Sequence, residues 1–564
     1  MKFADYPYKR PEIEILKIDF AAILSQFTSA TSAHEQIQHI DKLNLLRRDF
    51  NTMFNLVTIR HSIDTREKFY NDEQDFFDNN LPVYEGIQAE FYKVLIESKF
   101  RKELEIKLGK QIFLIAELSL KIFKPEIIDD LVKENILCTE YMELMASAII
   151  PFEGAERTLA ELGPFIRSTD RSMRKKAVEA KWNFLNSNAE KLDIIFDKLV
   201  KARDGIAKKL GYKNYVQLGY DRMLRSDYNP GMIAQYREQI LNEVVPISSE
   251  LKMQQAKRLG IDELRYYDEP LLFSDGNAKP KGSPEWIIDK GKKMYEELSH
   301  ETSDFISFMV EKELMDLVAK KGKATGGFCT YMPDFNSPFI FSNFNGTSTD
   351  VDVLTHEVGH AFQVYMSRNT DVMEYLWPTY EAAEIHSMSM EYFAYPWMNL
   401  FFNGDSQKYK YAHIVDSINF LPYGVAVDEF QHIIYEQPEL TPAERKAAYS
   451  EIEKKYLPHR KYENNPFLSN GGAWQAQAHI FQSPFYYIDY TLALICAFQF
   501  FIKDKQNHAE AFQDYVKLCK AGGSKSFIEL VQYANLRSPF DDGCVKDVLS
   551  EIKSYLYTLE PVQQ

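Results

Sequence analysis

The feature that most constrains the fold is a helical repeat of apolar residues that runs from about residue 20 to residue 320. Two examples are AHEQIQHIDKLNLLRRDFNTMFNLVTIRHSI (33–63) and DRSMRKKAVEAKWNFLNSNAEKLDIIFDKLVKARDGIAKKL (170–210). Their apolar residues recur three and four positions apart, which places them on one face of an α-helix. The breaks between such segments fall at Pro and Gly and look like helix ends and loops. We therefore expect one mostly helical body and not a string of separate domains.

The pattern changes at Gly322. The segment GKATGGFCTYMPDFNSPFIFSNFNGTSTD (322–350) is rich in Gly, Asn, Thr and aromatic residues, and it contains two short β-like runs, FCTYM and PFIFSNF. Turn-forming residues separate the runs, which predicts a small sheet or hairpin. An extended peptide could bind the edge of such a sheet through main-chain hydrogen bonds. A plain connecting hairpin fits the same pattern equally well.

The pentapeptide HEVGH follows within VDVLTHEVGHAFQVYM (351–366), which has a helical pattern. It contains His356, Glu357 and His360. Two histidines four residues apart on a helix project from the same face, so both imidazoles can bind one zinc ion. The glutamate between them lies beside the open coordination position of the metal. With 12 histidines in 564 residues, this pattern is informative but short of decisive.

A catalytic zinc needs a third protein ligand. The segment TYEAAEIHSMSMEYF (379–393) contains four candidates, Glu381, Glu384, His386 and Glu391. A thermolysin-type spacing of about 20 residues after the second histidine favours Glu381, but spacing alone leaves the choice open. Asp352 lies four residues before His356 on the same helical face. Its carboxylate could accept a hydrogen bond from the imidazole N–H of His356 that does not face the metal. Asp352 could equally be an acid favoured at a helix N-terminus.

A third group of candidates lies in SNGGAWQAQAHIFQSPFYYIDYTLALICAF (469–498), which contains His479, Tyr486, Tyr487 and Tyr490. Hydrolysis at a zinc ion passes through a tetrahedral oxyanion, which a phenol or imidazole donor can stabilise. Tyrosine suits this role because it donates while it remains neutral at pH 7. The chain has 34 tyrosines, however, and most of them must be packing or surface residues.

Composition excludes several partners. Acidic residues outnumber basic ones by 82 to 66, and this net charge of −16 would repel nucleic acid and an anionic membrane surface. No run of 18 apolar residues occurs, and the N-terminal segment has no apolar core of signal-peptide length. Five cysteines without CxxC spacing predict buried thiols in a reducing compartment. We therefore expect an unprocessed cytoplasmic protein.

The combination of HEVGH with AEIHSMSMEYF resembles the thimet oligopeptidase and oligoendopeptidase F family of zinc peptidases. The resemblance covers most of the chain and is closest to bacterial oligoendopeptidase F and Pz-peptidase-type enzymes. It implies one zinc ion per chain, bound by His356, His360 and Glu384. It also implies that Glu391 is the acidic residue that follows the ligand Glu384 by seven positions. Glu381 is then a candidate hydrogen-bond partner of a ligand, and His386 is not a ligand.

The same resemblance implies the remaining catalytic residues. Glu357 would act as the general base and acid. His479, Tyr486 and Tyr490 match the histidine and the closely spaced tyrosines that steady the oxyanion in this family. The interval from His479 to Tyr490 looks one residue shorter than in the thimet branch, so Tyr487 could take the place of Tyr486.

The resemblance implies a mainly α fold, with a large multi-helical ellipsoid in two halves around a deep substrate channel and a small β-sheet next to the zinc helix. Residues 1–320 would form the helical half that covers the channel, and residues 321–564 the catalytic half. The implied function is a zinc-dependent oligoendopeptidase that hydrolyses internal bonds of short unstructured peptides. A zinc exopeptidase and a non-catalytic peptide-binding protein on the same scaffold stay as alternatives. Whether the protein is a monomer or a dimer is left open.

Overall fold

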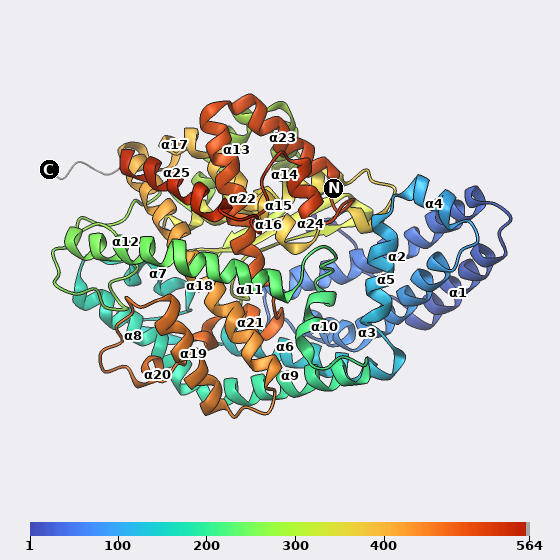
Figure 1. Cartoon of the computed structure of the whole chain (residues 1–564), viewed down its shortest axis with the longest axis horizontal. Coiled ribbons are helices and arrows are strands. Elements are labelled where there is room, and N and C mark those ends of the chain that lie inside the picture. The colour runs from blue at the N-terminus through green and yellow to red at the C-terminus, as the bar shows by residue number, and fades with distance from the viewer. Residues whose placement is uncertain (560–564) are drawn as a thin grey trace.

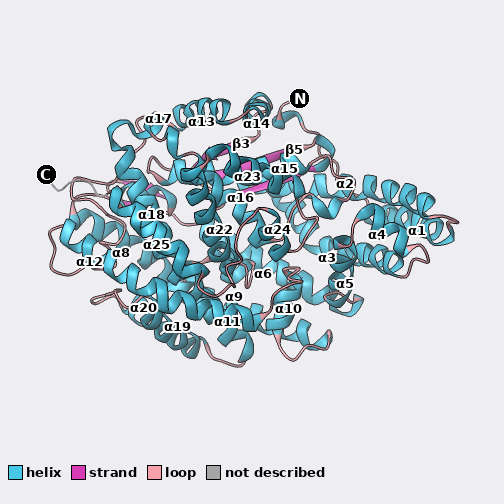
Figure 2. Ribbon diagram, turned by 45° about the horizontal axis from the view of Figure 1, so that its top comes forward, coloured by secondary structure: helices cyan, strands magenta, loops and turns pink. Residues whose placement is uncertain are grey.

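Helices make up most of the molecule in the computed structural model, which describes residues 1–559 (Figures 1 and 2). The segment 33–63 forms one helix, α2 (Ala33–Ile63). The segment 170–210 forms two helices that meet at Asn188, α8 (Arg171–Ser187) and α9 (Ala189–Lys209). The prediction of a mainly α fold is confirmed.

The helices of the first part of the chain precede the main sheet. They are α1 (Ile13–Ser29), α2, α3 (Lys68–Ile96), α4 (Arg101–Leu108), α5 (Gln111–Lys121), α6 (Ile128–Ala146), α7 (Gly163–Ile166), α8, α9, α10 (Tyr215–Arg222), α11 (Pro230–Gln239), α12 (Val245–Arg258), α13 (Pro284–Leu298) and α14 (His300–Glu311). A small hairpin interrupts them, with strands β1 (Ile150–Phe152) and β2 (Ala155–Arg157). In Figure 1, α1 and α4 lie at the right-hand end of the molecule, and α8 lies at the opposite end.

The second part of the chain is also helical. Its helices are α15 (Thr349–Ser367), α16 (Tyr380–Phe393), α17 (Asn399–Phe402), α18 (Ser406–Glu436), α19 (Pro442–Tyr456), α20 (Pro466–Ser469), α21 (Ala478–Gln482), α22 (Tyr487–Gln506), α23 (His508–Ala521), α24 (Phe527–Tyr533) and α25 (Cys544–Thr558). In Figure 1, α15, α16 and α22 lie together near the middle of the upper part of the molecule. HEVGH lies on α15, and the segment that holds the third-ligand candidates forms α16.

The predicted sheet is present, with strands β4 (Phe328–Met332) and β5 (Ser337–Phe344) joined by a turn at Asn336. β5 is central, pairs antiparallel with β4, and pairs in parallel with β3 (Met315–Val318). The sequence did not predict β3, which follows α14 directly. Because β3 lies before residue 321 and pairs with a strand beyond it, the sheet links the two proposed halves. The division into 1–320 and 321–564 stays a prediction.

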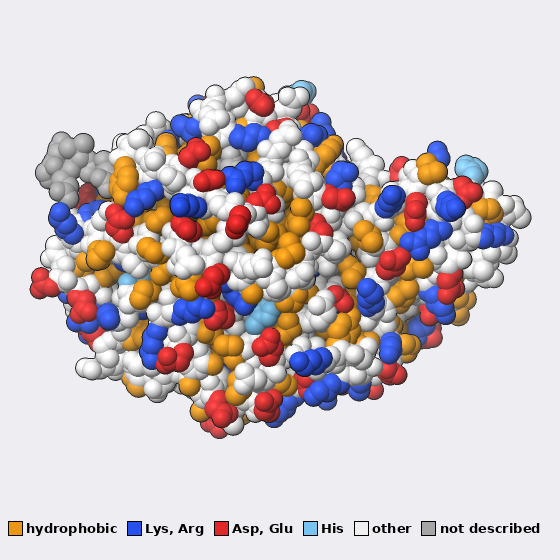
Figure 3. Space-filling view, viewed as in Figure 1, with side chains coloured by type: hydrophobic (Ala, Val, Ile, Leu, Met, Phe, Trp, Pro, Cys, Tyr) orange, Lys and Arg blue, Asp and Glu red, His pale blue; other side chains and the backbone are white. Residues whose placement is uncertain are grey.

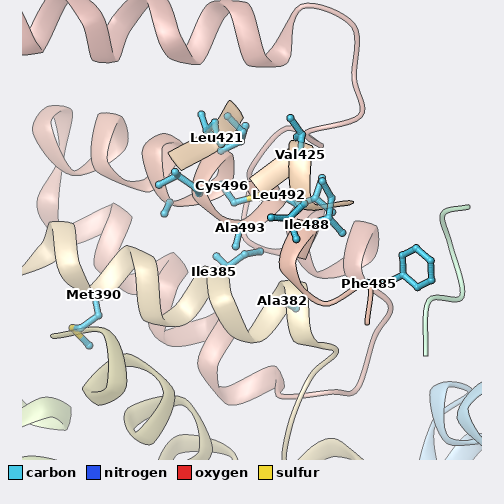
Figure 4. Packing of buried hydrophobic residues seen from close by; sticks show 14 of the residues in the cluster. Ala382, Ile385, Met390, Leu421, Val425, Phe485, Ile488, Leu492, Ala493 and Cys496 are labelled. Atoms are coloured by element: carbon cyan, nitrogen blue, oxygen red, sulfur yellow. The ribbon is translucent and has the colours of Figure 1, made fainter. Parts of the chain in front are cut away.

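A fully apolar layer holds the central helices together. α22 packs across α16 and α18, and Figure 4 shows the side chains at this contact, which include Ala382, Ile385, Leu421, Val425, Ile488, Leu492, Ala493 and Cys496. All eight are 0% exposed. Full burial of a Leu or Ile side chain stabilises a fold by roughly 1.5–3 kcal/mol. This layer therefore keeps α16 in a fixed position behind α15.

The prediction that the five cysteines are buried thiols holds only in part. All five are free, and Cys496, Cys519 and Cys544 are buried as predicted. Cys138 and Cys329 are partly exposed, and each lines a cavity. No described helix combines the length and the apolar character that are needed to cross a bilayer.

α15 and α16 approach each other closely at Gly359. A Cβ atom at this position would lie 2.5 Å from Cα of Ser387 and 2.7 Å from the carbonyl oxygen of His386. Real side chains do not tolerate such distances, so the absence of a side chain at Gly359 allows the two backbones to touch. The glycine of HEVGH thus sets the spacing between the two helices.

We predict that Gly359→Ala lowers the free energy of unfolding by about 1–3 kcal/mol, because the added methyl group overlaps the backbone of α16. Gly205 within α9 provides the matched control, since no described atom lies within 4 Å of a Cβ added there. Gly205→Ala should instead raise stability by about 0.5–1 kcal/mol. Urea unfolding of both variants measures the difference. Equal effects of the two substitutions would contradict the close contact.

Candidate metal centre

The crossing of α15 and α16 brings together the side chains of His356, His360 and Glu384. Oε2 of Glu384 lies 3.2 Å from Nε2 of His356 and 3.3 Å from Nε2 of His360. All three donor atoms lie within 4.8 Å of one another. Ligands at about 2.0–2.2 Å in a tetrahedral zinc site stand about 3.3–3.6 Å apart. The two distances to Glu384 therefore fit a zinc-sized ion with little movement of the side chains.

The outer nitrogen of His356 is held by Glu391. Nδ1 of His356 lies 2.7 Å from Oε1 of Glu391, whose Oε2 lies 2.7 Å from Nε2 of His413. Nδ1 of His413 in turn lies 2.7 Å from the hydroxyl of Tyr395. Burial opposes ionisation of Glu391, but its two histidine partners keep the pKa of this carboxyl below its ordinary value. A carboxylate on Nδ1 fixes the ring and leaves Nε2 free for a metal.

The interpretation of Asp352 as the partner of His356 is wrong. Oδ1 of Asp352 accepts a hydrogen bond of 2.5 Å from the hydroxyl of Tyr409, and Glu391 occupies Nδ1 of His356. Burial raises the pKa of the Asp352 carboxyl to about 6. Asp352 lies in the first turn of α15, as the alternative interpretation expected, where a helix favours an acid.

Both oxygens of Glu384 have hydrogen-bond donors. The hydroxyl of Ser387 donates to Oε2 at 2.7 Å, and the hydroxyl of Tyr486 donates to Oε1. Glu384 is fully buried. Burial by itself would raise the pKa of Glu384, but His360 and His356 outweigh this effect and hold it well below its ordinary value. The side chain is therefore an oriented carboxylate.

The other candidates on α16 lie away from the three donors. No hydrogen bond in the described residues joins Glu381 to His356, His360 or Glu384, so the expectation that Glu381 supports a ligand is not met. Burial raises the pKa of Glu381 to about 7, and Arg225 is the nearby cation that opposes this shift. The ring of His386 is also buried and lies outside the group of three donors, and its absence from the ligands stays a prediction.

Glu357 lies beside the donors with an unsatisfied carboxyl. Its side chain belongs to a residue only 6% exposed, and Oε2 has no hydrogen-bond partner among the residues that the structure describes. Burial raises its pKa. A Cβ at Gly327 would lie 3.2 Å from Oε1 of Glu357, so the glycine leaves room for this carboxyl. A desolvated, unpaired carboxyl is suited to accept a proton.

His479 and Tyr490 lie at the end of a chain of hydrogen bonds between neutral side chains. The hydroxyl of Tyr423 donates to Oε1 of Gln477 at 3.0 Å, and Nε2 of Gln477 lies 2.7 Å from Nδ1 of His479. An amide nitrogen only donates, so the proton of neutral His479 lies on Nε2, which is 3.1 Å from the hydroxyl of Tyr490. Burial lowers the pKa of His479 to about 4. Tyr490 can therefore accept from His479 and donate its own proton elsewhere.

The structure distinguishes Tyr486 from Tyr487. Tyr486 lines the cavity at the three donors, and its ring stacks on Tyr490 with centroids 5.0 Å apart. Tyr487 packs edge to face against Phe420 and Tyr423 and does not line that cavity. Tyr487 therefore does not take the place of Tyr486.

The metal donors open into a cavity of about 710 Å³. Its walls include the donors, Glu357, His479, Tyr486 and Tyr490, together with residues 327–331 at β4. β4 is an edge strand, and Asn55 of α2 donates to the carbonyl oxygen of Tyr331 at 2.9 Å. Residues of this edge strand thus line the same cavity as the metal donors.

The sequence did not predict several of the positioning residues. His413 lies on α18 and has no motif that links it to Glu391, and Gln477 lies two positions before His479 without a recognised pattern. Only Glu391 carried a signal, since it lies seven residues after Glu384 and so returns to the same face of the helix. Contacts between distant helices cannot be read from local spacing.

Solved structures resemble this chain over its whole length. The structure of Pz peptidase A with inhibitor 2 is 55% identical, has a TM-score of 0.99, and covers 99% of this chain and 100% of that chain. A Bacillus anthracis protein described as an oligoendopeptidase F is 54% identical, with a TM-score of 0.94 and 99% coverage of both chains. Among curated proteins, an oligoendopeptidase F homolog of Borreliella burgdorferi is 25% identical. That match covers 64% of this chain and 61% of the relative, less than two thirds of its length.

Two family profiles match in succession. Residues 3–123 match the peptidase M3 N-terminal domain, and residues 165–548 match peptidase family M3. The second match alone covers more than half of the chain. The resemblance to the thimet oligopeptidase and oligoendopeptidase F family is thereby confirmed, and the chain belongs to peptidase family M3.

Proposed function

We propose that this chain is a zinc-dependent oligoendopeptidase that hydrolyses internal bonds of short unstructured peptides. One observation carries the proposal: the donor atoms of His356, His360 and Glu384 and the unpartnered carboxyl of Glu357 face one cavity beside the edge of β4. Membership of peptidase family M3 implies a metal, and the likeness to Pz peptidase A supports peptides as substrates.

In this proposal His356, His360 and Glu384 hold one zinc ion per chain. When it is bound, zinc polarises the scissile carbonyl and lowers the pKa of the attacking water. Glu357 accepts a proton from that water and delivers it to the nitrogen of the leaving amine. Glu391 keeps His356 in the required tautomer through the bond to Nδ1.

Tyr490 and His479 would act on the carbonyl oxygen. As this oxygen gains negative charge, the hydroxyl of Tyr490 donates to it while His479 donates to Tyr490. Both groups remain neutral, so no charge has to be created before the reaction. Tyr486 has a different contact, because its hydroxyl is bound to Glu384, and it would orient this ligand and close the cavity beside it.

The cavity favours an endopeptidase over an exopeptidase. Apart from the metal donors, Glu357 and His479, the charged residues among its described lining are Arg47 and Glu374, and these two pair with each other at 2.5 Å. Apart from Glu357, the described lining of this cavity thus offers no unpaired charge to hold a peptide terminus. An extended peptide could instead add to the edge of β4, whose main-chain groups ignore side-chain identity.

Free thiols and surface charge support the remaining expectations. All five cysteines are unpaired, which agrees with a reducing compartment and supports a cytoplasmic location. On the face shown in Figure 3, acidic and basic side chains are interspersed. The absence of a nucleic-acid partner stays a prediction, and the choice between a monomer and a dimer stays open.

Cleavage of quenched fluorescent peptides of graded length, blocked at both termini, tests the function. We expect internal cleavage of short peptides, loss of activity with o-phenanthroline, and recovery with zinc. Cleavage of peptides only when a terminus is free would show an exopeptidase. Binding without cleavage would show a non-catalytic protein.

The ligand assignment predicts that substitution of Glu357 and substitution of Glu384 affect the metal content differently. Glu357→Gln should keep the metal and lose activity by roughly 10²–10⁴-fold, because only the proton acceptor is removed. Glu384→Ala should lose the metal together with the activity. Atomic absorption of the purified variants measures the metal content.

Glu381→Ala is the matched control for Glu384→Ala, since it makes the same change three residues earlier on α16. It should keep a full complement of metal. Full zinc retention by Glu384→Ala, or zinc loss caused by Glu381→Ala in a protein that remains folded by circular dichroism, would refute the assignment.

A further inference from the structure

The backbone directly before Tyr486 has an unusual conformation. Phe485 has a φ of +68°, in the left-handed region that a residue with a bulky side chain rarely adopts. Such a conformation is strained and persists only where the surrounding structure holds it in place. Tyr486 follows as the N-cap of α22, and its hydroxyl is bound to Glu384. The conformation of Phe485 therefore decides where the chain places Tyr486.

The ring of Phe485 is fully buried among aromatic rings of α10 and α18. The ring centroids lie 5.1 Å from His432, 5.5 Å from Tyr220 and Tyr435, and 6.3 Å from Tyr215. In Figure 4 this ring lies apart from the apolar layer between α16, α18 and α22. A Cβ added at Gly219 of α10 would lie 2.5 Å from Cδ2 and 2.8 Å from Cε2 of Phe485. The absence of a side chain at Gly219 thus leaves the space that the ring fills.

Both backbone polar groups of Phe485 have buried side-chain partners. Its N–H donates to Oε1 of Gln431 at 2.8 Å, and its carbonyl oxygen accepts from Nη2 of Arg225 at 2.6 Å. The same nitrogen of Arg225 lies 2.6 Å from Oδ1 of Asp489 on α22. Gln431, Arg225 and Asp489 are all buried. Arg225 therefore contacts the chain on both sides of Tyr486 and fixes the start of α22.

We infer that three residues outside the cavity at the metal donors position the hydroxyl of Tyr486 on Glu384. They are Gly219, Arg225 and Gln431, none of which lines that cavity. Each acts through the residue that precedes Tyr486, so each is a positioning residue and takes no part in bond cleavage. The inference rests on the proposed function, because it takes Glu384 as a ligand of the zinc ion. Two of the three belong to the chain before residue 321, although all the proposed ligands lie after it.

A double-mutant cycle on zinc affinity tests the inference with the full-length protein. Tyr486→Phe removes only the hydroxyl that bonds Glu384 and should weaken zinc binding about tenfold, as loss of a partner of a metal ligand does. Gly219→Ala places a methyl group against the ring of Phe485 and should weaken zinc binding by about three- to tenfold. The variant with both changes should bind zinc as Tyr486→Phe does, because Gly219→Ala acts through a bond that is already missing. Competition with a chromophoric chelator measures each affinity.

Further variants separate positioning from a general loss of packing. Gly205→Ala is the matched control, since it makes the same change inside α9, where no described atom lies within 4 Å of the added Cβ. It should leave zinc affinity unchanged. Phe485→Leu, combined with Gly219→Ala, makes room for the methyl group and should recover most of the lost affinity. Gln431→Met, which removes the acceptor of the Phe485 N–H, replaces Gly219→Ala in the cycle if circular dichroism shows that Gly219→Ala does not fold.

The outcomes are distinct. Effects of Gly219→Ala and Tyr486→Phe that multiply in the folded double variant overturn the inference, since Gly219 would then act independently of Tyr486. Zinc affinity that either single change leaves unchanged, or that Phe485→Leu does not recover, overturns it as well. A wild-type chain that binds no zinc, or that binds zinc and cleaves no peptide, overturns the proposed function instead.

Discussion

The close contact of α15 with α16 at Gly359 is the constraint on which the rest of the site depends. Because no side chain separates the two backbones there, Glu384 reaches within 3.3 Å of both histidine nitrogens. A methyl group added at Gly359 would lie 2.5 Å from Cα of Ser387, so the two helices would have to shift apart and carry the donors with them. The apolar layer between α16, α18 and α22 holds this contact from behind.

The second feature of the site is that its buried charged groups are paired. Glu391 lies between His356 and His413, and Glu384 has donors on both oxygens, so the ionised groups at the centre are compensated by direct contacts. Removing one partner of such a pair is costly, because the other charge then remains in a poorly solvated place. In contrast to these paired groups, the buried carboxyl of Glu357 has no hydrogen-bond partner on Oε2 among the described residues and is suited to accept a proton.

Local patterns in the sequence were enough to predict a large share of this structure. The helical period predicted α2 over its full length, and the β-like runs predicted β4 and β5. HEVGH predicted two donors on one face of α15, and the family resemblance selected Glu384 from four candidates on α16. Residues that meet only through tertiary packing were missed or misassigned. Asp352 shares a helical face with His356 yet bonds Tyr409, because Glu391 reaches His356 from another helix.

The most direct test of this account is X-ray absorption spectroscopy of the zinc-loaded protein and of its Glu384→Ala variant. The account predicts two imidazole nitrogens and one carboxylate oxygen at about 2.0–2.2 Å, together with a water ligand. In the variant the carboxylate contribution should vanish, along with most of the bound zinc. An unchanged ligand shell in the variant, or a shell with a third nitrogen such as that of His386, would contradict it.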